Sequence, residues 1–291
     1  SGRMSSQEFD FYIRMRRGID HLISIKNSQV EIDGGYEGET QFVLVEAKNQ
    51  KVEDFLVRQL FYPYRLWKNK TSKHVKSVFF TYSNDIFTFF IYEFCDDDRY
   101  NSLQLLKQVN YIIAHEKLTF YDLVDTFKRT NVKPEPSLPF PQADTFPRVV
   151  DLLSLLMKSD LSKQDITLNY DFDERQTNYY TSAGMYLGLI DKYENEERKP
   201  MFTLTGLGNR IMKLGTKNKF ITLVELILEH EPFYRVFEEY LRTNQLPRKE
   251  KVVKIMKNSQ LYNIKSDSTF FRRAQTVLSW IDWMIKLPET Y

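Results

Sequence analysis

Val30-Glu31-Ile32-Asp33-Gly34-Gly35 opens the stretch that decides the fold, and Phe42-Val43-Leu44-Val45-Glu46-Ala47-Lys48 closes it. Residues 41–47 form an apolar, β-branched run that is typical of a buried central strand. Residues 29–33 alternate between polar and apolar side chains, like a strand that ends at a Gly-Gly turn. We therefore expect a hairpin that brings Asp33 close to Glu46.

The charged residues of this stretch indicate metal-dependent hydrolysis of phosphodiester bonds. Residues two apart in a strand share a face, so Glu46 and Lys48 project together. Mg²⁺ is usually held by one or two carboxylates plus a substrate phosphate, which makes Asp33 and Glu46 the expected metal ligands. Such an ion polarises a phosphoryl oxygen and lowers the pKa of a bound water, while Lys48 orients that water or offsets charge on the phosphate.

These residues resemble the motif of the PD-(D/E)XK nuclease superfamily. Asp33, Glu46 and Lys48 stand at the motif positions, and Ile32 stands where the motif has a proline, a departure that the superfamily often shows. The resemblance implies an α/β nuclease core with a mixed sheet flanked by helices, and Mg²⁺ as the cofactor, with Mn²⁺ as a substitute. The alternative is a solvated Glu-Ala-Lys strand end, which is common in α/β proteins.

A helical pattern over residues 55–67 follows the motif. Its Gln59 and Tyr64 look like the glutamine and tyrosine that many superfamily members carry on the helix after the catalytic strand. This likeness adds Gln59 to the expected catalytic residues, and the same helix would let Arg58 reach a phosphate. Pro63 is expected to kink the helix. The alternative is an aromatic core helix with incidental polar residues.

The flanking segments complete a compact domain. Residues 6–23 are predicted to form a helix with Ser6 as its N-cap. Residues 75–82 and 87–94 are predicted strands joined by a turn at Ser83-Asn84-Asp85, and residues 101–114 supply an edge element. The resulting αββαββ order is also that of the superfamily's core, and we expect the nuclease domain to cover residues 4–117.

The pattern changes after residue 117. Residues 118–143 are expected to hold a helix and an extended interdomain linker, because four prolines fall between residues 134 and 141. Residues 144–214 show three helical patterns and a β-hairpin, which describes a winged-helix domain. Residues 215–291, including one helix over residues 222–243, are expected to form a second, mostly helical domain like a winged helix or helix-turn-helix unit.

Two helices of these domains are expected to contact DNA. In the helix over residues 173–187, Tyr180, Ala183 and Leu187 share a face that would pack inward. The opposite face and the first turns of a later helix from Asp267 carry Arg, Asn and Gln, which pair bidentately with base edges. A winged helix used only for protein contacts or domain packing is the alternative. The expected DNA-contacting residues are Arg58, Arg175, Gln176, Asn178, Thr181, Ser182, Arg272, Arg273 and Gln275.

The distribution of charge supports a nucleic-acid partner. The net charge of the chain is only +2, but residues 242–273 hold nine Lys or Arg and two acidic residues. This segment therefore has a net charge of +7, and the remainder of the chain has a net charge of −5. Basic surface is therefore expected in the C-terminal third, where it would contact phosphates. The single cysteine, Cys95, fits a reducing cytoplasm, and the sequence shows no zinc spacing, long apolar run or signal-peptide pattern.

Taken together, the chain most resembles a type II restriction endonuclease. The resemblance implies Mg²⁺-dependent cleavage of double-stranded DNA at a short specific sequence, leaving 5′-phosphates, and a cognate DNA methyltransferase in the host. Because duplex cleavage needs two strand cuts, we expect a homodimer at least on DNA. The alternatives are a structure-specific repair or junction nuclease of the same superfamily and a non-catalytic DNA-binding regulator.

Overall fold

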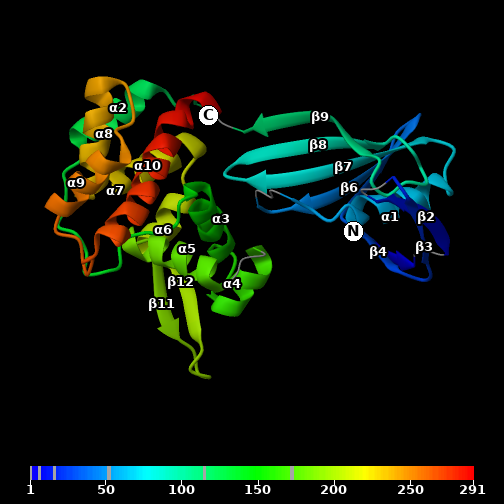
Figure 1. Ribbon diagram of the computed structural model, residues 1–291, viewed down its shortest axis with the longest axis horizontal. Helices are drawn as coiled ribbons and strands as arrows, with labels where there is room; N and C mark the ends of the chain where they lie inside the picture. Colours follow the sequence, from blue (N-terminus) through cyan, green and yellow to red (C-terminus); the bar gives the residue numbers. More distant parts are fainter. Residues whose placement is uncertain (1, 6–7, 16–17, 51–53, 114–115, 171–173) are drawn as a thin grey trace. The chain divides into compact units, whose positions relative to one another are not determined.

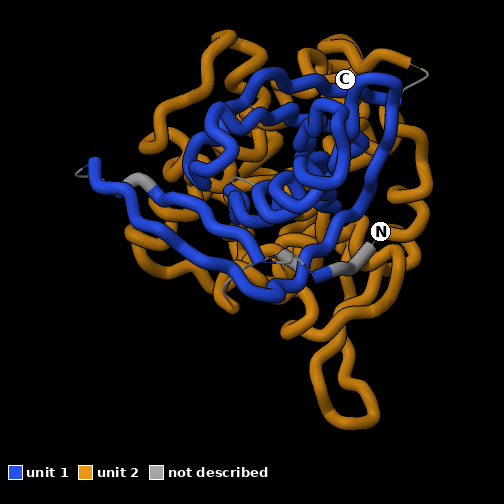
Figure 2. Tube along the Cα trace, turned by 90° about the vertical axis from the view of Figure 1, so that its right-hand side faces the viewer, with its two compact units in different colours: residues 1–113 blue, residues 114–291 orange. Residues whose placement is uncertain are grey.

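The structure is a computed structural model that describes residues 2–5, 8–15, 18–50, 54–113, 116–170 and 174–291. The chain is of mixed α and β composition (Figure 1). It divides into two compact units, residues 1–113 and residues 114–291 (Figure 2). Among the described residues, no helix is long and apolar enough to cross a membrane.

A five-stranded mixed sheet forms the centre of the first unit. Its strand order is β5-β6-β7-β8-β9. Strands β6 and β7 run parallel and are connected through helix α1, Arg58–Lys68, whereas the other neighbouring pairs are antiparallel. The strands are β5 Gly34–Glu37, β6 Gln41–Lys48, β7 His74–Ser83, β8 Ile86–Phe94 and β9 Leu103–Ile112.

Helix α1 packs on one face of this sheet. Phe42 and Leu44 of β6 are buried in one core with Leu60 and Phe61 of the helix. Trp67, near the end of α1, stacks on Phe42 with 4.4 Å between the ring centroids. Aromatic pairs of this kind stabilise the fold beyond the area that they bury, so the helix is fixed against the strand that carries Glu46 and Lys48.

The predicted hairpin of β7 and β8 is confirmed. Asn84 and Asp85 have φ angles of 52° and 62°. Two central residues with positive φ are the signature of a two-residue type I′ turn, and Asn and Asp tolerate this conformation better than most residues. Strand β9 then pairs with β8 as the last strand of the sheet, as expected for residues 101–114.

The helix predicted over residues 6–23 is wrong. Strand β2, Phe9–Arg14, pairs antiparallel with β3, Asp20–Ile25. Phe9, Phe11 and Ile13 alternate with exposed neighbours, and this period of two suits a strand that is covered on one face. The expected N-cap Ser6 lies outside the described residues.

The expected hairpin of residues 29–33 with residues 41–47 is also wrong. Strand β4, Gln29–Ile32, pairs with β1, Gly2–Ser5, and it is β5 that pairs with β6. Gly34 and Gly35 therefore lie inside a strand, and the turn falls at Gly38, whose N–H donates to the carbonyl of Gln41 at 2.8 Å.

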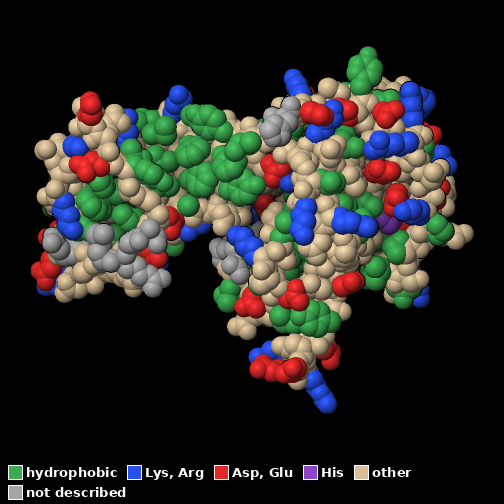
Figure 3. Space-filling view, turned by 180° about the vertical axis from the view of Figure 1, so that it is seen from behind, with side chains coloured by type: hydrophobic (Ala, Val, Ile, Leu, Met, Phe, Trp, Pro, Cys, Tyr) green, Lys and Arg blue, Asp and Glu red, His purple; other side chains and the backbone are tan. Residues whose placement is uncertain are grey.

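The sheet face opposite α1 is strongly apolar. Its strand register places Phe80 beside Phe89, Tyr82 beside Phe87, and Phe87 beside Tyr111. These side chains belong to neither hydrophobic core and are half-buried or exposed. Figure 3 shows apolar side chains gathered over the surface of this unit.

The second unit is mostly helical and has one continuous core from Leu118 to Leu287, with Trp280 as its largest buried side chain. A small antiparallel sheet, in the order β10-β12-β11, lies among its first helices. Its strands are β10 Leu161–Ser162, β11 Ile190–Glu194 and β12 Pro200–Leu204. Its helices are α2 Phe120–Arg129, α3 Phe146–Leu156, α4 Lys163–Tyr170, α5 Glu174–Tyr186, α6 Gly206–Met212, α7 Thr216–Leu228, α8 Glu231–Thr243, α9 Lys249–Asn258 and α10 Asp267–Thr290.

The proline-rich segment expected as an interdomain linker packs within the second unit. Phe140 and Ala143 are buried at 2% and 1% exposure. Glu135 accepts a hydrogen bond from the backbone N–H of Glu231 at 3.0 Å. The prolines therefore stiffen a segment that is part of a folded core.

The single helix expected over residues 222–243 is two helices, α7 and α8. Helix α7 ends at Leu228, and Pro232 stands in the first turn of α8. Proline is tolerated in a first turn, where its missing N–H costs nothing, but disrupts a helix interior. This physical rule explains why the chain breaks between residues 228 and 231.

Candidate active site

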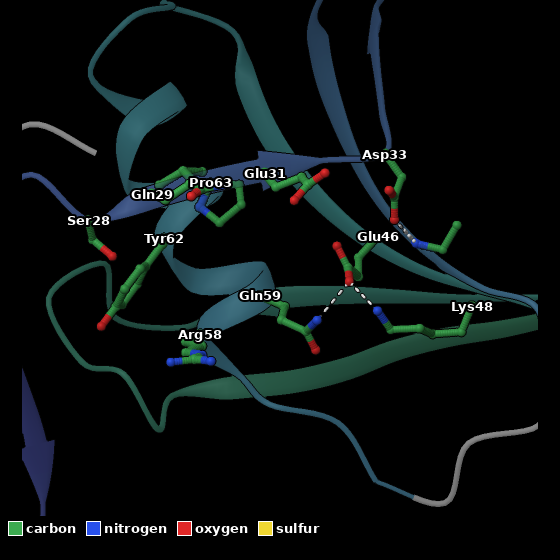
Figure 4. A pocket seen from close by; sticks show the side chains of 12 residues that line it. Ser28, Gln29, Glu31, Asp33, Glu46, Lys48, Arg58, Gln59, Tyr62 and Pro63 are labelled. Atoms are coloured by element: carbon green, nitrogen blue, oxygen red, sulfur yellow. Dashed lines mark hydrogen bonds and ion pairs between the residues drawn. The ribbon is translucent and has the colours of Figure 1, made fainter. Parts of the chain in front are cut away.

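A pocket of about 500 Å³ lies in the first unit, where β4, β6 and α1 meet. Figure 4 shows its side chains converging from these three elements. It is lined by Ser28, Gln29, Val30, Glu31, Asp33, Glu46, Ala47, Lys48, Arg58, Gln59, Tyr62 and Pro63. All four residues expected to be catalytic, together with Arg58, therefore lie around one cavity.

The alternation of strand β6 places Glu46 in this pocket. Phe42, Leu44 and Glu46 are the buried residues of the strand, two positions apart. The first two enter the apolar core, whereas Glu46 lies where the core gives way to the pocket. Only 8% of Glu46 is exposed. Because a strand repeats every two residues, Lys48 follows on the same face.

Two donors hold the Glu46 carboxylate. Lys48 Nζ lies 2.7 Å and Gln59 Nε2 lies 2.9 Å from the same oxygen, Oε1 (Figure 4). Burial raises the pKa of Glu46, Lys48 lowers it, and the negative charges of Asp33 and Glu31 add to the rise. The pKa of Glu46 is raised on balance, with burial as the largest cause, so the folded site disfavours the charged form of this carboxyl group.

Asp33 is tied to the strand that carries Glu46. Its backbone N–H donates to the carbonyl of Val45 at 3.2 Å. Its carboxylate oxygen Oδ2 accepts from the backbone N–H of Ala47 at 2.8 Å. The expected closeness of Asp33 to β6 is thus confirmed, although it is reached at the junction of β4 and β5 and not through the expected hairpin.

Glu31 and Tyr62 also line the pocket but were not predicted from the sequence. Glu31 precedes Asp33 by two residues, and both are exposed while Ile32 between them is buried. The period of two in the strand could therefore have predicted that Glu31 shares a face with Asp33. Tyr62, and not the expected Tyr64, is the tyrosine of α1 at the pocket. Tyr64 is buried and donates its hydroxyl to Asp97.

The pocket offers oxygen ligands suited to a hard divalent cation. Asp33 and Glu46 supply two carboxylates that line the same pocket. The raised pKa of Glu46 comes chiefly from burial, and a bound cation would favour its charged form. In the part of the chain that the structure describes, no group of three or more His, Cys, Asp or Glu side chains is arranged to hold a metal ion. An ion bound in this pocket would take Asp33 and Glu46 as its protein ligands and the remaining ligands from water and substrate.

The expected DNA-contacting residues of α5 differ in accessibility. Arg175 and Asn178 are exposed, and Gln176 and Ser182 are half-buried. Thr181 is 2% exposed, and its hydroxyl donates to the carbonyl of Thr177 at 2.8 Å. Thr181 is therefore not accessible to DNA in this structure, because its hydroxyl bonds to the preceding turn of its own helix, as threonine in a helix readily does.

The expected contacts of α10 also fall into two groups. Arg272 and Gln275 are exposed. Arg273 is half-buried, and burial together with the charge of Arg272 lowers the pKa of Arg273. Its Nε atom is buried without a hydrogen-bond partner among the described residues. Arg272 is thus the more accessible of the two cations.

Two family matches follow the division of the structure. Residues 1–112 match a family described as Domain of unknown function (DUF6997). Residues 148–289 match a family described as Domain of unknown function (DUF7226). No curated protein and no solved structure matches the chain. Neither description names an activity.

Proposed function

We propose that the chain is a Mg²⁺-dependent endonuclease of the type II restriction kind, which cleaves double-stranded DNA at a short sequence and leaves 5′-phosphates. The observation that carries this proposal is the convergence of Asp33, Glu46, Lys48 and Gln59 on one pocket. They come from the junction of β4 and β5, from strand β6 and from helix α1, and the contacts of Lys48 and Gln59 with one Glu46 oxygen order the group.

The chain's own residues would share the work of hydrolysis. Asp33 and Glu46 would hold the Mg²⁺, which when bound supplies charge to the scissile phosphate and a more acidic water. Lys48, whose side chain is one-third exposed, would orient the attacking water and offset charge that develops on the phosphate. Gln59 would position the Glu46 carboxylate, which it already contacts.

The fold around the pocket supports a PD-(D/E)XK core in part. The parallel pair β6 and β7, joined through α1 and followed by β8, has the connectivity of the ββαββ portion of that core. The first helix of the αββαββ order has no counterpart here, since a β-hairpin occupies its place. The proposal therefore rests on the strands and the helix that carry the pocket.

The second unit supplies a surface for reading DNA in this proposal. Helix α3, strand β10, helices α4 and α5, and the hairpin of β11 and β12 follow one another in the order of a winged helix. Helix α5 would enter the major groove with Arg175 and Asn178, its exposed polar residues. A dimer on DNA would supply the second strand cut, and a cognate methyltransferase would protect the host's own sites.

The decisive experiment is digestion of long mixed-sequence DNA with Mg²⁺, followed by sequencing of all ends. The wild type, Glu46→Gln and the matched control Glu39→Gln are compared, because Glu39 is an exposed acid of the same unit outside the pocket. We expect discrete ends beside one shared motif for the wild type and the control, and none for Glu46→Gln. Intact DNA binding without cleavage by any of them would favour a regulator, and ends at junctions or at random would favour a repair nuclease.

A further inference from the structure

The pocket has a second end that the proposed hydrolysis does not use. At about 500 Å³ it falls within the range of roughly 300–1,000 Å³ that is common for pockets holding whole small ligands. Asp33 and Lys48 lie at one end of it (Figure 4). Arg58, Tyr62 and Ser28 lie at the other, beyond Gln59.

At this second end, Arg58 is a cation that has no acidic partner among the described residues, although its charge acts on the hydroxyl of Tyr100. Lys48, the other basic residue that lines the pocket, forms an ion pair with Glu46. In the described part of the chain, no hydrogen bond or ion pair engages the Arg58 guanidinium, and the side chain is exposed. A guanidinium binds phosphate through paired hydrogen bonds more readily than it binds most other groups.

Tyr62 provides a fixed apolar surface beside this cation. It follows Arg58 by four residues in α1, a spacing that puts both side chains on the same helix face. Its ring packs edge-on against Phe9 with 5.4 Å between centroids, and lies 6.1 Å from that of Phe11. Strand β2 therefore holds the ring in place before any ligand arrives, which lowers the entropy lost on binding.

We propose that this end of the pocket is a nucleotide subsite. Arg58 binds the phosphate that neighbours the scissile one along the strand, and Tyr62 packs against the deoxyribose between them. A cation that follows the backbone beside an aromatic side chain is a common way for proteins to hold a nucleic-acid strand. That the ligand is DNA rests on the proposed nuclease function. That Arg58 binds a phosphate does not depend on this function.

The test measures binding of thymidine 5′-monophosphate to the full chain in chelator, by calorimetry or nuclear magnetic resonance. Arg58→Gln is compared with Lys107→Gln, which removes an equal charge from an exposed site on β9 of the same sheet. We expect Arg58→Gln to weaken binding about tenfold, as for the loss of one charge-assisted hydrogen bond, and Lys107→Gln to leave it unchanged. Equal effects of the two variants, or no binding by the wild type at millimolar ligand, would overturn the subsite.

Tyr62→Ala separates the sugar contact from the phosphate contact. We expect this variant to bind thymidine 5′-monophosphate more weakly and to bind inorganic phosphate as the wild type does. An equal loss of affinity for both ligands would overturn the role given to Tyr62. Cleavage of DNA by the wild type, with nucleotide binding indifferent to Arg58, would overturn the subsite alone. Nucleotide binding through Arg58 without any cleavage would overturn the nuclease proposal and keep the subsite.

Discussion

Replacing Glu46 by glutamine should stabilise the first unit in the absence of metal. The pKa of Glu46 is raised, chiefly by burial and further by Asp33 and Glu31, against the opposing effect of Lys48. The folded state therefore favours the neutral form, which Gln mimics in shape. Because folding disfavours the carboxylate relative to the neutral form, we expect Glu46→Gln to raise the free energy of unfolding at pH 7.

The sign of the pH dependence follows from proton uptake. Between the unfolded value of 4.5 and the higher folded value, the native state binds more protons than the unfolded state, so the stability of the wild type falls as pH rises. The stability of Glu46→Gln does not fall in this way, because glutamine does not titrate. The difference between the two proteins should be small at pH 4, widen as the pH rises through the folded pKa, and then stay constant.

Native-state hydrogen exchange of the β6 and β7 amides, measured in chelator, reports the free energy of unfolding of the first unit alone. Added Mg²⁺ should make the wild type more stable than Glu46→Gln. A ligand at ten times its Kd stabilises the folded state by about 1.4 kcal/mol, and the variant has lost one of the two carboxylates that would bind the ion. Glu39→Gln, at an exposed position, serves as the control. A Glu46→Gln protein that is less stable than the wild type at pH 7 would refute the reasoning, since the Lys48 and Gln59 contacts would then outweigh burial.

Three further outcomes test the second unit. Gly208→Ala should lower the free energy of unfolding by about 1–3 kcal/mol in a urea titration, because the new Cβ would lie 2.4 Å from the carbonyl oxygen of Leu189. An unchanged midpoint of the urea titration would contradict this. Thr119→Ala should cost about 1 kcal/mol by the same measurement, since Thr119 and Asp122 form a capping box on α2, and a loss below 0.3 kcal/mol would count against it. Arg175→Ala, at an exposed position, should weaken binding of the cognate duplex by about 1–3 kcal/mol in a fluorescence titration without changing stability, and equal affinity would remove α5 from the DNA contacts.

The motif strand could be predicted because its signals are local. The β-branched run of β6 specifies a buried strand, and the period of two then places Glu46 and Lys48 on one face. The prediction of an N-terminal helix, with Ser6 as its N-cap, was wrong although Phe9, Phe11 and Ile13 already alternated with a period of two. In that segment the strand period was the better guide.

Other features depended on partners that are distant in sequence. Gly34 and Gly38 are both acceptable turn residues, and the turn falls at Gly38 because β5 extends the sheet beside β6. The choice between Tyr62 and Tyr64 depends on the rotation of α1, which is set by burying Phe61 and Tyr64 in the core. Neither the turn nor the rotation can be deduced from the residues nearby.

The parallel pairing of β6 with β7 also determines when the pocket can form during synthesis. Every residue that lines the pocket precedes residue 64, but β6 gains its parallel neighbour only after β7, which ends at Ser83, has been made. Parallel strands pair slowly because a connecting segment must close first, and a growing chain presents its N-terminus first. A nascent chain on the ribosome would therefore carry the pocket's side chains without their assembled arrangement, so the activity proposed for this pocket would begin only after the sheet is complete.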